Sequence, residues 1–174
     1  MRSSAENDVK IVRREEKQAR LISLLGEAMA KAVASRDSTA VKISVIARSA
    51  ESPVITALLH CLTETSDTPF ETRVILAKVC STSDSEPLAR LARVRRVGGR
   101  SIDDAHEQLV VDTKVAWYGD SMRRDPIKLD AYERIISSDD KAIAWAERTF
   151  ELIWQRCTAS EDTNAASAAS ATQN

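Results

Sequence analysis

Apolar positions recur every three or four residues over the first part of the chain, which predicts one long helix from about Asp8 to Arg36. The apolar stripe of this helix consists of Val12, Ala19, Ile22, Met29 and Val33, widened by Leu21, Leu25, Ala28 and Ala32. Its first half is crowded with charged residues, among them Lys10, Arg13, Arg14, Lys17 and Arg20. We expect that half to project into solvent or to pair with another chain.

Runs of β-branched residues alternate with helical patterns through the middle of the chain. Strands are predicted at 41–47 and 72–79. Helices are predicted to begin near Pro53 and Pro87, since proline suits the first turn of a helix, and the second should end at the glycine pair 98–99. Strand–helix–strand units of this length predict a mixed, mostly parallel sheet flanked by helices, an α/β fold.

The last part of the chain predicts a strand pair, two helices and a tail. Strands at 107–112 and 114–118 are joined by a turn at Asp112 and Thr113. Helices are predicted over 129–136 and from a cap at Ser138 or Asp139 to about Cys157. Three parts result: an N-terminal helix (1–36), an α/β domain (37–157) and a tail (158–174) with too little apolar surface to order itself.

Composition narrows the class of protein further. The chain has 174 residues, of which 43% are hydrophobic and 29% charged, as in ordinary globular proteins. Its net charge of -1 gives no global attraction to nucleic acid or to an anionic membrane. The first ten residues have no apolar stretch like that of a signal peptide, and three widely spaced cysteines match no zinc or redox motif. We therefore expect a cytoplasmic protein with no membrane partner, metal or cofactor.

The stretch from Ala105 to Ser121 resembles the signature of the phospholipase D superfamily. That signature has a His, a Lys two residues later, an Asp seven residues after the His, and a Gly-Ser pair seven residues after the Asp. Asp112 and Gly119 are in register with it, and the apolar run before Asp112 fits the family's strand. The resemblance covers roughly residues 40–157. It implies one half-domain of that fold, here preceded by a long helix.

Three departures from the signature remove its chemistry. Ala105 stands at the position of the nucleophilic His, Glu107 at that of the Lys, and Asp120 at that of the Ser. Alanine cannot form a phosphohistidine, and a carboxylate at the Lys position would repel phosphate by on the order of 1–4 kcal/mol at contact distance. His106 could replace the nucleophile only through a slip of one residue, which turns every side chain of a strand to the opposite face. We therefore expect no catalytic residues.

Two further groups are candidates for ligand binding. The run Arg90–Arg100 could form a phosphate-binding patch, or it could be a solvated helix face paired with local acids. The loop from Trp117 to Pro126 places aromatic, basic and acidic residues at a strand end, where α/β proteins often bind ligands, although a core Trp beside an Arg–Asp cluster explains it equally. The candidate ligand residues are Arg95, Arg96, Arg100, His106, Tyr118, Ser121, Arg123 and Arg124.

These patterns favour a non-catalytic regulatory or interaction module that acts as a homodimer, with a protein partner still to be identified. The long first helix motivates the dimer, and so does the resemblance, since halves in that family pair across one face. The alternative is a nucleic-acid or phospho-ligand binding protein that uses the Arg90–Arg100 cluster. It is less favoured, because no aromatic residue interleaves the arginines and no helix-turn-helix or zinc finger is visible. A residual phosphodiesterase is the third and least favoured hypothesis.

Overall fold

The computed structural model describes residues 9–35, 40–65, 70–77, 86–97, 102, 104–123 and 130–159. Within these ranges eight strands form one sheet in the order β1-β7-β6-β5-β2-β3-β4-β8. The strands are β1 (Val9–Arg13), β2 (Val41–Ala47), β3 (Phe70–Leu76), β4 (Arg93–Arg96), β5 (His106–Val111), β6 (Val115–Ser121), β7 (Asp130–Ile136) and β8 (Thr158–Ala159). The helices are α1 (Arg14–Ala34), α2 (Pro53–Glu64), α3 (Glu86–Leu91) and α4 (Asp140–Arg156).

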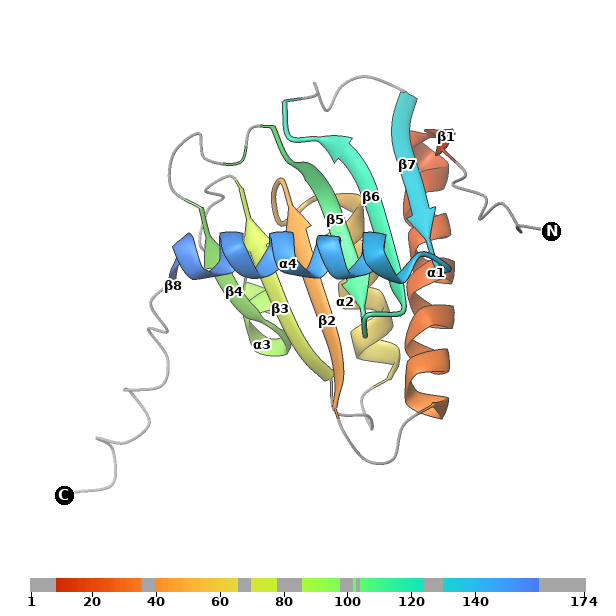
Figure 1. Ribbon diagram of the computed structural model, residues 1–174, viewed down its shortest axis with the longest axis horizontal. Helices are drawn as coiled ribbons and strands as arrows, with labels where there is room; N and C mark the ends of the chain where they lie inside the picture. The colour runs from red at the N-terminus through yellow and green to blue at the C-terminus, as the bar shows by residue number, and fades with distance from the viewer. Residues whose placement is uncertain are drawn as a thin grey trace.

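Helices cover both faces of the sheet (Figure 1). The helices α1 and α2 pack on one face, where Leu25 and Leu58 meet side chains of the strands such as Leu109 in the largest apolar core. The last helix, α4, crosses the other face and buries Phe150 and Ala146 there in two smaller cores. The predicted α/β fold with helices flanking a mixed sheet is thereby confirmed.

The sheet is mixed, as predicted, but it is mostly antiparallel where a mostly parallel one was expected, because parallel pairing is confined to one half of it. Strand β3 lies between β2 and β4 and is parallel to both, whereas the other strand pairs are antiparallel. The strands β5 and β6 form the predicted hairpin. Asp112 and Thr113 have φ values of 49° and 54°, the left-handed conformation that a tight hairpin turn needs. Short connections of this kind can join only antiparallel neighbours.

The start of the chain differs from the prediction. Residues Val9–Arg13 form the edge strand β1, antiparallel to β7, and the helix begins only at Arg14. Three β-branched residues among five suit a strand better than the first turns of a helix, and β7 supplies the hydrogen-bonding partner. The charged half does not simply project into solvent either, because Lys17 is only 1% exposed.

Two other predicted helices are wrong in part or entirely. Residues Asp130–Ile136 form the strand β7 between β1 and β6, not a helix, because pairing on both sides outweighs the helix propensity of its Ala, Glu and Arg residues. The helix predicted after Pro87 ends at Leu91, and Arg93–Arg96 continue as the strand β4 beside β3.

Some predictions fall beyond the described residues. The glycine pair 98–99 lies outside them, as does the predicted tail from residue 160 onward. The first two residues of the predicted tail, Thr158–Ala159, differ from the prediction, because they pair with β4 at the sheet edge as β8. Among the helices that the structure describes, none has the length and apolar character that crossing a membrane requires.

Candidate functional site

The positions that resemble the phospholipase D signature gather mostly at one end of the β5–β6 hairpin. Ala105 directly precedes β5, Glu107 is the second residue of β5, and Gly119 and Asp120 lie near the end of β6. Asp112 is at the opposite end of β5, in the hairpin turn, where its backbone N–H donates to the carbonyl of Lys42 at 2.8 Å. Glu107, Gly119 and Asp120 therefore form one cluster, whereas Ala105 packs against the core of Phe150 and Asp112 lies in the hairpin turn.

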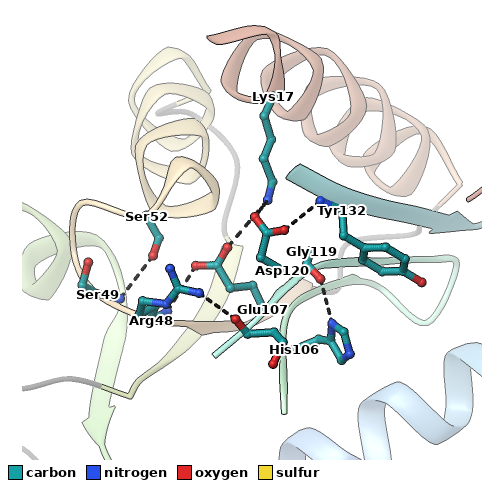
Figure 2. A network of polar contacts seen from close by, with 10 residues as sticks. Lys17, Arg48, Ser49, Ser52, His106, Glu107, Gly119, Asp120 and Tyr132 are labelled. Carbon is teal, nitrogen blue, oxygen red and sulfur yellow. Dashed lines mark hydrogen bonds and ion pairs between the residues drawn. The ribbon is translucent and has the colours of Figure 1, made fainter. Parts of the chain in front are cut away.

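A β-bulge sets the direction of the side chains in this cluster. His106 pairs with Ser121 and Gln108 with Tyr118, so the single residue Glu107 faces two residues of β6. Simple alternation from Trp117 would turn position 120 toward α4. The extra residue of the bulge re-aims the strand, and the carboxylate of Asp120 points to α1, on the same side as Glu107 (Figure 2).

A buried lysine from α1 meets both carboxylates (Figure 2). The ammonium group of Lys17 lies 2.8 Å from Asp120 Oδ2 and 3.9 Å from Glu107 Oε2. The second oxygen of Asp120, Oδ1, accepts a hydrogen bond from the backbone N–H of Tyr132 at 2.7 Å. Because Lys17 and Glu107 are only 1% and 3% exposed, this ion-pair network is largely closed to solvent.

The loop after β2 completes the network from the other side. The backbone N–H of Arg48 donates to Glu107 Oε1 at 3.3 Å, and its guanidinium donates to the carbonyl of Ser121 at 2.6 Å. The hydroxyl of Ser52, at the start of α2, accepts from the backbone N–H of Ser49 at 3.2 Å. Two cationic side chains thus balance two carboxylates, so the buried group is close to neutral as a whole.

The glycine at position 119 makes room for a tryptophan. A Cβ atom at Gly119 would lie 2.2 Å from the ring of Trp117, so any larger residue forces the indole to move. Trp117 is fully buried, and the ammonium of Lys17 lies 5.3 Å from the centroid of its ring, in range for a cation–π contact. Gly119, Trp117 and Lys17 are therefore one packing unit on the α1 side of the sheet.

His106 belongs to the opposite face, as the alternation of a strand predicts. Figure 2 shows its ring on the α4 side of β5, away from Lys17. Its Nδ1 lies 2.9 Å from the carbonyl oxygen of Gly119; a carbonyl only accepts, so Nδ1 carries the proton. The ring also contacts Tyr132, with centroids 5.5 Å apart. His106 is thus separated by the sheet from the Glu107 network.

A pocket of about 350 Å³ lies on this α4 face. The sheet contributes His106, Tyr118, Tyr132, Arg134 and Ile136, and α4 contributes Trp145. Burial raises the pKa of the Tyr118 hydroxyl, and the nearby positive charge of Arg134 partly opposes that rise. The hydroxyl of Tyr118 is therefore protonated at neutral pH and available as a donor.

The arginines predicted to form a phosphate patch do not lie on one surface. Arg95 is on the α4 face, where its guanidinium lies 4.4 Å from the ring of Trp154 and donates to the Trp154 carbonyl at 2.8 Å. Arg96 is the next residue of β4, and alternation turns it to the other face. Arg90 pairs with Glu86 on the exposed surface of α3, and Arg100 lies outside the described residues. Arg90, Arg95 and Arg96 therefore do not share one surface.

The remaining candidates follow the end of β6. Arg123 forms an exposed ion pair with Asp104 at 2.9 Å, and its backbone N–H lies 3.4 Å from the Ser121 hydroxyl. The partner of Arg123 thus lies outside the loop 117–126, and Asp120 of that loop pairs with Lys17, so these ion pairs differ from an Arg–Asp cluster within the loop. Arg124 lies outside the described residues. Among the residues that the structure does describe, no three His, Cys, Asp or Glu side chains gather closely enough to hold a metal ion.

Sequence reasoning missed the partners of these residues. Lys17 lies four positions before Leu21 and eight before Leu25, and that spacing places it on the buried stripe of α1. A lysine in register with buried leucines was the available signal for a buried ion pair. Trp145 and Arg134 gave no such signal, because their role depends on how α4 lies across the sheet.

Comparisons with known proteins show the fold. No family model matches the chain, and neither does any curated protein. Among solved structures, Nuc from Salmonella typhimurium, a phospholipase D family member, matches with a TM-score of 0.57 and 12% identity, over 87% of this chain and 97% of that one. NucT from Helicobacter pylori matches with a TM-score of 0.56 and 10% identity, over 87% and 98%.

A third similar structure is TrmBL2, an archaeal chromatin protein whose structure shows a novel mode of DNA binding. It matches with a TM-score of 0.58 and 12% identity over 88% of this chain, which spans about half of its length, 55%. At these identities the likeness concerns the backbone alone. The chain therefore has a phospholipase D-like fold.

Proposed function

We propose that the chain is a non-catalytic interaction module on a phospholipase D-like scaffold. One observation carries this proposal. Glu107, at the position where the resembled signature has its phosphate-binding Lys, is a buried carboxylate paired with Lys17 and hydrogen-bonded by Arg48. The site that would bind a phosphodiester is thus filled by the protein's own charges.

The neighbouring positions support the same conclusion. Ala105 has no nucleophilic atom, and Asp120 adds a second negative charge beside Glu107. Lys17 could be thought to replace the missing lysine from another element. Its ammonium is held 2.8 Å from Asp120 in a nearly inaccessible position, however, so it is not free to donate to a substrate phosphate.

A phosphodiesterase assay tests the loss of catalysis. The protein should not hydrolyse bis(para-nitrophenyl) phosphate above the rate of the buffer. His106→Ala removes the histidine nearest the cluster, and His60→Ala removes the exposed histidine of α2 as a matched control. Hydrolysis that disappears in His106→Ala but persists in His60→Ala would overturn the proposal.

Homodimer formation is the second part of this proposal. Its support is the resemblance. The long helix adds none, because the apolar stripe of α1 is covered by the chain's own α2 and sheet and does not offer a free dimer surface. Light scattering over a range of micromolar concentrations tests it directly. A dimeric mass supports the module as a homodimer, and a monomeric mass at all concentrations would remove the dimer from the proposal.

A further inference from the structure

The pocket on the α4 face has the size and the walls of a ligand site. Its volume of about 350 Å³ falls at the lower end of the range that small-molecule pockets occupy. Its walls come from three strands and one helix, since β5, β6 and β7 supply His106, Tyr118 and Tyr132 while α4 supplies Trp145. Four ring side chains around one hollow favour a planar occupant over a flexible aliphatic one.

Packing alone explains the position of the Trp145 ring less well than that of the other three rings. It is 66% exposed, the most exposed large apolar side chain among the described residues. Trp117, by comparison, is completely buried. An indole that borders a pocket and stays exposed can stack on a ligand, a contact worth about 1–3 kcal/mol for each nucleobase on an aromatic side chain.

The charge of the pocket is positive. Arg134 is the only charged group among its lining residues apart from the titratable His106, and none of them is acidic. Arg134 lines the pocket, and because its Nε is buried, its terminal guanidinium nitrogens are the donors that can face a ligand. The adjacent acid of β7, Glu133, points to the other face, where it pairs with Arg20. An anionic ligand would therefore meet no opposing carboxylate on the pocket wall.

The imidazole of His106 is held in one orientation. Its Nδ1–H donates to the Gly119 carbonyl at 2.9 Å, which leaves Nε2 as the nitrogen available to a ligand. The contact with Tyr132 fixes the plane of the ring further. Orientation by the protein lowers the entropy that a ligand contact would otherwise cost.

We propose that this pocket binds a nucleoside phosphate, with the base against Trp145 and the phosphate beside Arg134 and His106. The shared chemistry is a planar base joined to a phosphate, and its source is either a free mononucleotide or one nucleotide of a single-stranded nucleic acid. The inference goes beyond the proposed interaction module. It does not depend on lost catalysis, because the pocket and the Glu107 network lie on opposite faces of the sheet.

Calorimetric titration of the full chain tests the proposal with four probes. They are adenosine 5′-monophosphate, adenosine, inorganic phosphate and a short single-stranded deoxythymidine oligonucleotide. Binding of the mononucleotide with clearly weaker binding of adenosine and of phosphate supports the composite site. Tighter binding of the oligonucleotide than of the mononucleotide identifies the single strand as the source, and the reverse order identifies a free nucleotide.

Substitutions at two positions, Trp145 and Arg134, locate the binding. Trp145→Leu should weaken the better nucleotide probe by at least about tenfold through lost stacking, while Trp145→Phe should retain most of the affinity. Arg134→Met should weaken the nucleotide but leave adenosine unchanged. The matched controls are Leu152→Ala and Arg156→Met, which change an exposed apolar and an exposed basic residue about two or more turns farther along α4 than Trp145.

Three results would overturn the proposal. They are no binding of either nucleotide probe at millimolar concentration, binding that Trp145→Leu leaves unchanged, and equal losses in the α4 control variants. If Arg134→Met fails to fold, as judged by circular dichroism, the exposed Trp145 still decides the question.

Discussion

At the β5–β6 end of the sheet, the neighbouring residues His106 and Glu107 meet different surroundings on the two faces. Glu107 points to the α1 face and meets a buried, charge-balanced network, whereas His106 points to the α4 face and borders an open pocket. On the first face the carboxylates of Glu107 and Asp120 are matched by cationic side chains of the chain itself, and on the second Arg134 lines a pocket whose wall has no acidic residue. Internal matching of charges suits stability, and an unopposed cation beside an exposed ring suits binding.

The largest effect on stability should come from breaking the ion-pair network of Lys17, Glu107 and Asp120 on the α1 face. Lys17→Met removes the cation and leaves Glu107 and Asp120 buried without it, so the free energy of unfolding should fall by about 3–5 kcal/mol. Urea unfolding measures it. Lys31→Met changes an exposed lysine on the same helix and should alter stability by less than about 0.5 kcal/mol. A loss under about 1 kcal/mol in Lys17→Met would show that the network contributes little.

The next largest effect should come from filling the space under Trp117. Gly119→Ala places a Cβ against the indole and should cost about 1–3 kcal/mol in unfolding free energy. Combining it with Trp117→Phe, which removes the ring that the Cβ meets, should give a total cost smaller than the sum of the two single changes. Gly26→Ala in α1 is the control: its Cβ meets nothing within 4 Å, so it should stabilise the helix. Additive costs would contradict the contact between Gly119 and Trp117.

On the α4 face, a pH titration should separate the effect of burial on the pKa of Tyr118 from the effect of the Arg134 charge. Burial raises the pKa of Tyr118 above its ordinary value of 10.0, and Arg134 opposes that rise. Ultraviolet difference absorbance should therefore show Tyr118 ionising above pH 10.0, and later still in Arg134→Met. Tyr118→Phe identifies the signal against that of Tyr132. An unchanged titration of Tyr118 in Arg134→Met would contradict the electrostatic interaction between Tyr118 and Arg134.

The sign of the linked stability follows from that direction. A raised pKa means that the folded protein holds the phenolic proton more tightly than the unfolded chain does. The stabilisation is fully present below the ordinary value of 10.0 and is lost as the pH rises through the folded pKa. Wild-type stability should therefore decline with rising pH in this window more steeply than that of Tyr118→Phe.

The smallest effect on stability should come from Trp145. Because the indole is mostly exposed, Trp145→Leu should change the free energy of unfolding by no more than about 0.5 kcal/mol. Thermal unfolding followed by circular dichroism checks this. A large loss would mean that Trp145 supports the fold and would weaken the contrast between the two faces.

The sequence predicted those elements whose pattern agrees with their environment. The strands β2 and β3, the β5–β6 hairpin and α4 combine β-branched or helical periodicity with matching burial, and all were expected close to their observed positions. The strand β7 was not, because it carries Glu133 on a buried face and Ile136 on the other, which hides the alternation. Its conformation depends on β1 and β6, and no local pattern reports those partners.

The candidate site was predictable only along a single strand pair. The spacing from Ala105 to Asp120 located one cluster, and the alternation of β5 placed His106 on the face opposite Glu107. Local spacing could not bring Lys17 to that cluster, because the contact depends on how α1 packs across the sheet. Local spacing could not reveal the pocket either, since the path of α4 decides that Trp145 and Tyr132 line the same hollow.

The long reach of the Lys17 contact has a consequence for folding kinetics. Lys17 and Asp120 are 103 positions apart in the chain, so their ion pair closes a very large loop. Loops of that size are closed late, after local units such as β2, α2 and β3 have formed. Interactions that are absent from the transition state mainly slow unfolding and leave the folding rate nearly unchanged. We therefore expect the buried lysine to set how long a folded molecule persists, more than how quickly it forms.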